Sequence, residues 1–182
     1  MTSKSIVIAA FCLTQTAKGQ NNFHKYYLEG QISSGFQQQS SVAGLGGAFG
    51  FYLNQNSSID FRAREIYNFK NTVVIGAISI NYRYHLSNGI FVGAGFGHHH
   101  EISEQDYIER PLEAAMGTHD NIAHRSGISA EIGYNFKPIA SRGFFQRFYP
   151  TSSIQLTYMM KGKGPNPLVT ANVGLRIGLQ KY

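Results

Sequence analysis

The stretch IGAISINYRYHLSNGIFVGAGFG, residues 75–97, decides the expected fold of this chain. Apolar residues and tyrosines occupy the even positions of its first half, and the polar and charged residues occupy odd ones, which is the period of a β-strand. Ser87-Asn88-Gly89 interrupts the alternation, and an Asn-Gly pair between two such runs is typical of a tight hairpin because it tolerates positive φ angles. The stretch therefore predicts two neighbouring antiparallel strands.

The two faces of this hairpin differ in polarity. One face is apolar along its length and ends in Tyr82 and Tyr84, whereas the other carries Asn81, Arg83 and His85 among small residues. A water-soluble sandwich or lipocalin-like barrel, which is the alternative fold, would turn the apolar face inward. The polar face is too rich in glycine to cover an exterior, so the pattern favours lipid outside and a polar lumen inside.

The first residues have the pattern of a secretory signal peptide. Lys4 precedes an apolar run, residues 6–13, that is too short to cross a bilayer as a helix. We therefore expect residues 1–19 to be removed and residues 20–182 to form one barrel domain. The only cysteine, Cys12, lies in the expected signal peptide, so the mature chain would depend on neither disulfides nor thiol chemistry.

Composition supports a membrane-embedded β protein. Charged residues make up 14% of the chain, against about 25% in ordinary globular domains, and glycine, phenylalanine and tyrosine are abundant. The formal charge is +6, but the basic residues are scattered singly and form no stripe. Nucleic-acid binding therefore has little support.

The period-two pattern recurs eight times, with turn residues between the runs. Strands of about ten residues suit a tilted barrel that crosses an apolar band about 25 Å tall. We therefore predict an all-β, eight-stranded antiparallel up-and-down transmembrane β-barrel. One charged residue, Glu65, falls on the outward face. The expected strands are residues 26–36, 42–53, 59–69, 75–86, 90–97, 127–136, 153–161 and 170–180.

With this alternation, the signal peptide, the phrase NYRYHLSNGIFVGAGFG and a last strand ending GLRIGLQKY, the sequence resembles small eight-stranded outer-membrane proteins of Gram-negative bacteria, of the porin-like outer-membrane β-barrel domain family. The resemblance covers nearly all of the mature chain. It implies an integral protein of the cell outer membrane with both termini in the periplasm. The implied partners are outer-membrane lipid, lipopolysaccharide and the barrel-assembly machinery, and we expect no cofactor.

The same orientation assigns each connection to a side of the membrane. The longest connection, residues 98–125, is rich in histidine and acidic residues, and we expect it to be an extracellular loop that could recognise a ligand. The other expected extracellular connections are residues 37–41, 70–71 and 162–167, and the periplasmic ones are residues 54–58, 87–89 and 137–150.

Charged residues recur on the inward face of the predicted strands. Buried charges must be paired or hydrated, so in a barrel this narrow their mutual pairing would plug the lumen. A small-solute or ion pore is the alternative. The predicted lumen network consists of Glu29, Asp60, Arg62, Arg64, Arg83, Glu131 and Arg176.

Histidines of the predicted loop are candidate ligands for a divalent transition metal. They are His98, His100, His119 and His124. Adjacent histidines point to opposite sides of a strand, and the spacing matches no standard zinc pattern, so we expect a solvated loop without a metal.

The hairpin turn carries the one catalytic candidate. His85-Leu86-Ser87-Asn88 resembles the His-x-Ser-Asn stretch of outer-membrane lipid A deacylases, where histidine activates serine for attack on an ester, and Glu101 is a candidate third member. The turn alone explains Ser-Asn-Gly, and it lies too early in the chain and at the wrong end of the barrel for that family. We therefore predict a non-enzymatic envelope protein with a structural or surface-interaction role, and a lipid A esterase as the alternative.

Overall fold

The computed structural model describes residues 24–37, 39–160 and 167–179. The expected signal peptide, residues 1–19, lies outside the described residues. So do residue 180, the last of the predicted final strand, and residues 162–166 of the predicted connection 162–167. Among the described residues, no helix is both long and apolar enough to cross a membrane.

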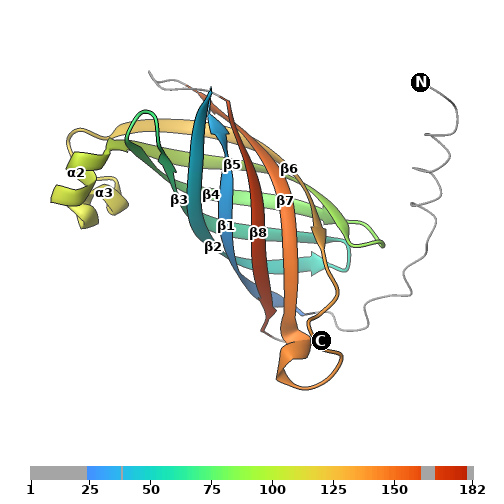
Figure 1. Cartoon of the computed structure of the whole chain (residues 1–182). Helices are drawn as coiled ribbons and strands as arrows, with labels where there is room; N and C mark the ends of the chain where they lie inside the picture. Colours follow the sequence, from blue (N-terminus) through green and yellow to red (C-terminus); the bar gives the residue numbers. More distant parts are fainter. Residues whose placement is uncertain (1–23, 38, 161–166, 180–182) are drawn as a thin grey trace, which may run out of the picture.

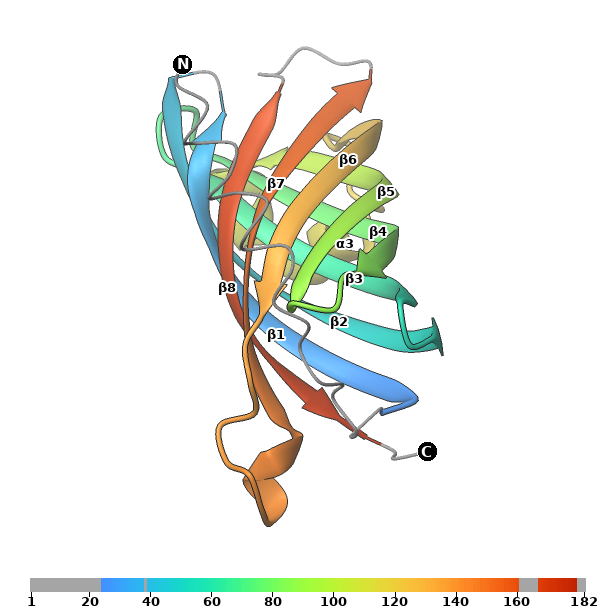
Figure 2. The ribbon, with the colours of Figure 1, turned by 90° about the vertical axis from the view of Figure 1, so that its right-hand side faces the viewer.

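Eight antiparallel strands form one closed barrel (Figures 1 and 2). Each strand pairs with the next along the chain, and β8 closes the barrel against β1, with Tyr27 opposite Gly178 and Gln37 opposite Leu168. The strands are β1 (Tyr26–Gln37), β2 (Ser40–Asn54), β3 (Ser57–Asn68), β4 (Val73–His85), β5 (Ile90–Ser103), β6 (Ala123–Asn135), β7 (Phe148–Met160) and β8 (Leu168–Gly178).

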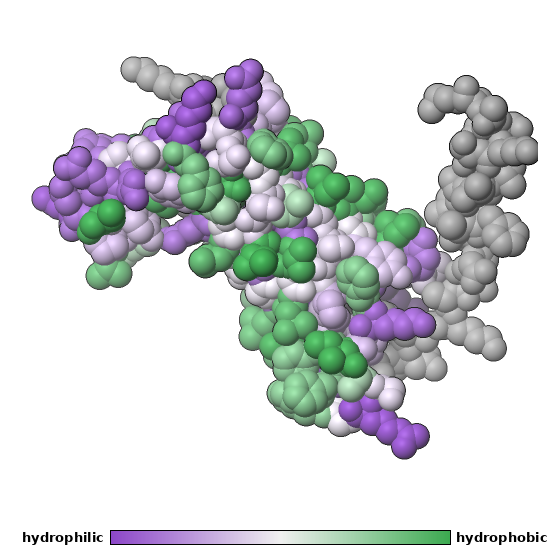
Figure 3. Space-filling model, in the orientation of Figure 1, coloured by the Kyte–Doolittle hydropathy of each residue, from purple (hydrophilic) through white to green (hydrophobic). Residues whose placement is uncertain are grey.

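The barrel wall is apolar outside and polar inside. On β1, Leu28 and Ile32 expose 46% and 68% of their surface, whereas Glu29 and Gln31 between them are buried in the lumen. In Figure 3, hydrophobic side chains cover much of the wall in view, and hydrophilic ones gather at its ends. This polarity confirms the predicted eight-stranded transmembrane barrel and is the reverse of the water-soluble alternative.

The hairpin between β4 and β5 confirms the predicted turn but uses a different geometry. The backbone N–H of Gly89 donates to the carbonyl of Leu86 over 3.2 Å, and that of Leu86 donates to Ile90 over 2.8 Å. Gly89 has a φ of +90°, while Asn88 is not among the described residues with positive φ. The loop therefore has three residues, and the glycine at its end has the positive φ. The side chain of Asn88 accepts a hydrogen bond from the Ile90 N–H.

The predicted loop over residues 98–125 is wrong at both ends. β5 continues through Ser103 and β6 begins at Ala123, so only residues 104–122 form the connection, which contains helices α2 (Glu104–Glu109) and α3 (Pro111–Met116). The polar composition suggested a loop, but the strand pairing continues through His100 opposite His124. We name residues 104–122 the helical connection.

The predicted connection over residues 137–150 is also displaced. β7 begins at Phe148, and residues 136–147 connect it to β6 through the short 3₁₀ helix η1 (Phe144–Arg147). Pro150 made this region resemble a loop. It is tolerated because β7 is paired with β6 only from Thr151 onward, while its pairing with β8 starts at Phe148.

The two ends of the barrel are unlike. The last residues of β1, β3, β5 and β7 lie at one end, which we name the helical end. The other end, which we name the terminal end, holds the connections after β2, β4 and β6, the start of β1 and the end of β8. Figure 1 shows α2 and α3 at one end and the β6–β7 connection at the other.

Candidate functional site

A network of charged side chains lies in the middle of the lumen. Arg83 is 1% exposed and lies at its centre, where its Nη1 is 3.0 Å from Glu29 Oε2 and its Nε is 3.0 Å from Glu131 Oε2. The same Nε is 3.4 Å from Asp60 Oδ2. One guanidinium therefore joins three carboxylates that come from β1, β3 and β6.

Two other arginines bind the same carboxylates. Arg176 on β8 donates to Glu29 over 2.7 Å, and Arg62 on β3 lies 3.4 Å from Glu131 and 3.6 Å from Asp60. A charge without water is stabilised only by close partners, so each arginine depends on carboxylates from other parts of the wall. The network thereby ties strands together across the lumen.

Arg64 extends the network without a carboxylate. Its Nη1 donates to Gln155 Oε1 over 2.7 Å, and the same oxygen accepts from Arg62. Within the described parts of the chain, no carboxylate lies within ion-pair distance of Arg64. The structure thus places all seven predicted lumen residues in one cluster, with four arginines against three carboxylates. These are Glu29, Asp60, Arg62, Arg64, Arg83, Glu131 and Arg176.

An apolar layer lies in the lumen between the charge network and the helical end. Its side chains are at most 2% exposed and pack against one another from β2, β3, β4, β7 and β8. This layer was not predicted from the sequence, although the alternation places its residues on the inward face. They are Val42, Ile66, Ile75, Met159 and Leu168.

An aromatic layer lies on the other side of the network. Arg83 stacks over the ring of Phe91 at 4.6 Å, and Arg176 stacks over Tyr27 at 4.2 Å. Tyr52 joins the layer, 5.5 Å from the ring of Tyr27. Cation–π contacts thus continue the network toward the terminal end. Sequence analysis missed these aromatics because inward tyrosine and phenylalanine do not stand out among outward ones.

The helical connection is folded against the outside of the barrel. Tyr67 on β3 donates to Glu104 over 2.8 Å, and the Tyr107 hydroxyl lies 3.1 Å from both carboxylate oxygens of Glu65. Glu65 is the outward charge that broke the sequence pattern. The structure explains it, because α2 covers this carboxylate and gives it a hydrogen-bond donor.

A small core beneath the connection strengthens this contact. Ile102, Ala114 and Ile122 are buried together, with Val74 and Tyr107 packed against them. A pocket of about 340 Å³ that is open to the outside lies beside this core, lined in part by small residues of β2, β3 and β4. The connection is therefore an ordered element that packs against the outer surface of the barrel.

The N-terminus of α2 is capped by the side chain of Ser103, which interacts with Asp106 in the first turn. Ser103 accepts from the backbone N–H of Asp106 over 3.1 Å, and its hydroxyl donates to the Asp106 carboxylate over 2.7 Å. That hydrogen bond lowers the pKa of Asp106 below its ordinary value, while Asn121 adds a second donor. The carboxylate therefore stays ionised at the N-terminus of the helix, where negative charge is favourable.

Three of the four candidate metal ligands lie together. His98, His100 and His124 place ring nitrogens within 4.8 Å of one another. His119 does not join them, since its Nδ1 accepts from the backbone N–H of Asn121 over 3.1 Å. His99 points the other way and is buried in the lumen.

The candidate catalytic residues do not come together. His85 lies in the lumen, bonded to Ser58 over 2.8 Å and to Asn135 over 3.2 Å, while Ser87 is exposed in the turn. Glu101 pairs with Arg125 near the helical end. Its strand partner Ile75 is ten residues from His85 on β4, roughly 33 Å at about 3.3 Å per residue. The arrangement provides no triad from these residues.

No family model and no curated protein matches this sequence. Among solved structures, Neisserial surface protein A (NspA) aligns with a TM-score of 0.56 at 10% identity, over 85% of this chain and 97% of that one. The N-terminal β-barrel domain of Pseudomonas aeruginosa OprF aligns with a TM-score of 0.49 at 16% identity, over 85% of this chain and 100% of that one. A de novo designed transmembrane β-barrel gives 0.47 at 8% identity, over 87% and 99%. Together with the closed barrel and its polarity, the likeness to NspA shows that this chain has the fold of the small outer-membrane β-barrel proteins.

Proposed function

We propose that this protein is a non-catalytic, integral outer-membrane barrel that holds the helical connection at the cell surface as an interaction site. The observation that carries this proposal is the build of the connection. It shares a small apolar core with the barrel wall and forms two hydrogen bonds with it. A loop that only joins two strands needs neither a core nor hydrogen bonds to the wall, since a short turn closes a hairpin equally well.

The outer side of the connection supports a role in recognition. Ile108, Leu112 and Met116 recur every four residues across α2 and α3 and expose 69%, 76% and 67% of their surface. Large apolar side chains that are exposed on a structured element are typical of contact surfaces. A partner with a complementary apolar surface would bury them.

The lumen supports a role without conduction. The charge network is flanked by an apolar layer on one side and aromatic rings on the other, and Arg62 and Arg83 are 1% exposed at its centre. An ion that crossed the lumen would have to break the ion pairs between carboxylates and arginines. In a narrow interior of low dielectric constant, this costs much free energy. A small-solute or ion pore is therefore the weaker candidate.

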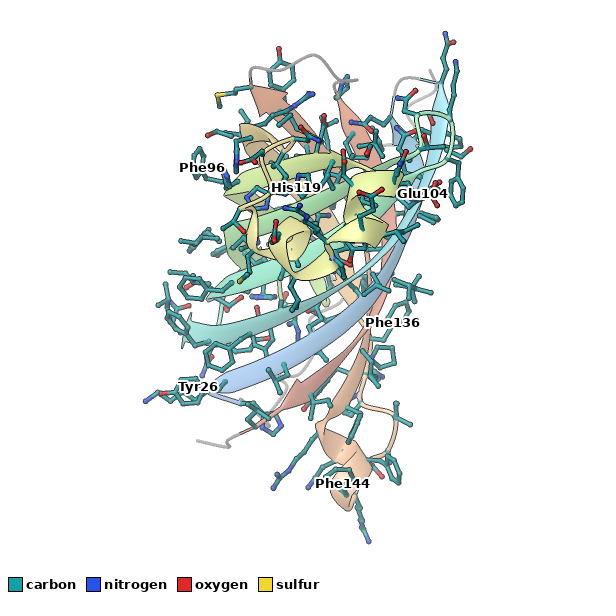
Figure 4. All side chains as sticks on the ribbon, turned by 90° about the vertical axis from the view of Figure 1, so that its left-hand side faces the viewer. Tyr26, Phe96, Glu104, His119, Phe136 and Phe144 are labelled. Atoms are coloured by element: carbon teal, nitrogen blue, oxygen red, sulfur yellow. The ribbon has the colours of Figure 1, made fainter. Side chains whose placement is uncertain are left out.

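Cysteine labelling in intact cells tests the proposal. Since Cys12 would leave with the signal peptide, a single introduced cysteine is the only thiol of the mature chain. Glu109→Cys places a thiol on an exposed position of α2, and Arg142→Cys places the matched control on an exposed position of the β6–β7 connection. Figure 4 shows this separation, with Glu104 and His119 at one end of the barrel and Phe144 at the other.

We expect a membrane-impermeant maleimide to label Glu109→Cys in intact cells. It should label Arg142→Cys only after the outer membrane is permeabilised. The reverse pattern would place the helical connection in the periplasm and overturn the proposal. Recovery of the protein in the soluble periplasmic fraction would overturn the membrane location itself.

A further inference from the structure

Three histidines form a compact cluster on the outer wall at the helical end. His98 and His100 are two residues apart on β5 and therefore share its outward face. His124 on β6 lies directly opposite His100 in the strand register. Two neighbouring strands thus fix the backbone positions of all three imidazoles, which is more rigid support than a loop offers.

The spacing of the rings suits a single metal ion. Nε2 of His98 lies 3.1 Å from Nδ1 of His124, and the ring centroids are 4.7, 5.0 and 5.3 Å apart. Zinc bonded tetrahedrally to three imidazole nitrogens at about 2.0–2.1 Å holds those nitrogens roughly 3.4 Å apart and the rings about 5 Å apart. The centroid spacings already lie near those of such a site.

The type of ligand atom determines which class of metal ion the cluster would bind. Within the described residues, the cluster holds imidazoles and no carboxylate or thiol. Neutral imidazole suits zinc, copper and nickel, whereas calcium and magnesium require oxygen ligands. Among the described residues, a ring nitrogen of His98 forms a hydrogen bond with a ring nitrogen of His124.

We propose that His98, His100 and His124 bind one divalent transition-metal ion of the zinc type on the outer face of the barrel. Three histidines leave the fourth position of a tetrahedral ion open. Since His98 and His124 are exposed, that position is accessible from outside the barrel to water or to a donor atom of another molecule. Metal binding at this outer site does not depend on whether the lumen conducts ions.

The helical connection packs directly on this cluster. Gly117, which caps α3 with a φ of 73°, lies so close to the imidazole of His100 that a Cβ at this position would collide with the ring. A glycine here both permits the positive φ and makes room for the ring. His100 is therefore held between the barrel wall and the connection.

Metal titration of the refolded mature chain tests the proposal. The protein is prepared in detergent without a polyhistidine tag, and Zn²⁺ binding is measured by isothermal titration calorimetry. We expect one ion per chain. Loss of a partner outside the ligand shell already weakens metal sites roughly 10-fold or more, so each of His98→Ala, His100→Ala and His124→Ala should weaken binding by at least this factor.

His119→Ala is the matched control, because it removes a histidine of the same region that lies outside the cluster. It should bind Zn²⁺ as the wild type does. Co²⁺ gives a second readout, since tetrahedral Co²⁺ absorbs visible light strongly and octahedral Co²⁺ only weakly. Circular dichroism and heat-dependent gel mobility verify that each variant is folded.

Three results would overturn the proposal. The first is a folded wild type that binds no Zn²⁺ in the titration. The second is binding that survives replacement of all three cluster histidines. The third is an equal loss of affinity in His119→Ala, which would place the ion in the helical connection.

Discussion

At the scale of single residues, Arg83 has the largest expected effect on stability. Its guanidinium joins Glu29, Asp60 and Glu131 and is almost wholly buried. Arg83→Ala would leave these carboxylates without their shared partner. Since breaking a buried ion pair from one side costs about 3–5 kcal/mol, we expect a loss of that size in the free energy of unfolding.

Urea unfolding of the refolded barrel in detergent measures this effect. Arg110→Ala is the matched control, because Arg110 also forms an ion pair, with Glu113, but both side chains are about half exposed or more. Exposed pairs contribute roughly 0–1 kcal/mol, so this variant should unfold nearly as the wild type does. Equal stability of the two variants would show that the network is hydrated instead of closed.

Tyr107 is the residue that should govern attachment of the helical connection. Burial raises its pKa above the ordinary value of 10.0, and the hydrogen bond to Glu65 acts in the same direction. Because the pKa is raised, the Tyr107 hydroxyl stays protonated at neutral pH and can donate this hydrogen bond. Its contribution should fall only as the pH rises above 10 toward the pKa of the folded state.

Tyr107→Phe removes this hydrogen bond and keeps the ring. We expect the connection to detach about 5-fold more often, the equivalent of about 1 kcal/mol for a partly exposed hydrogen bond to a carboxylate. The measurement is the rate of cleavage by a glutamate-specific protease after Glu109 or Glu113. A rate equal to that of the wild type would show that the apolar contacts alone hold the connection.

At the scale of elements, the barrel should fold without the helical connection. The pairing of β5 with β6 extends to Glu101 opposite Ala123, and the connection packs on the outer side of the wall, with one backbone hydrogen bond from Glu104 to Thr72 in the β3–β4 turn. Replacing residues 104–122 with a short Asn-Gly turn should therefore preserve the β-type circular dichroism spectrum and the gel mobility shift on heating. Loss of both would show that the connection is part of the folding unit.

The alternation in the sequence was sufficient to predict the number of strands and their inward face, but not where β5 ends or where β6 and β7 begin. It could not predict the partners across the lumen, because the pairing of Arg83 with Glu131 depends on how the sheet closes. The helical connection was misjudged for a related reason. Three consecutive histidines resemble a polar loop, and only the register that brings His124 opposite His100 reveals them as strand residues.

At the scale of the whole molecule, the barrel separates two environments. Its wall presents aliphatic and aromatic side chains outward, while its interior is built from charges and small polar groups. An apolar layer and an aromatic layer lie on either side of the charges, and from this we infer an interior closer to a protein core than to an aqueous channel. We therefore propose that this interior does not conduct.

Conductance in planar lipid bilayers tests that claim most directly. The mature chain is refolded, its insertion is verified by co-flotation with liposomes, and its current is recorded in symmetric salt. We predict no steady channel from the wild type. Steady conductance steps that change when Arg62 and Arg83 are replaced would contradict the account, because they would show that ions pass through the charge network.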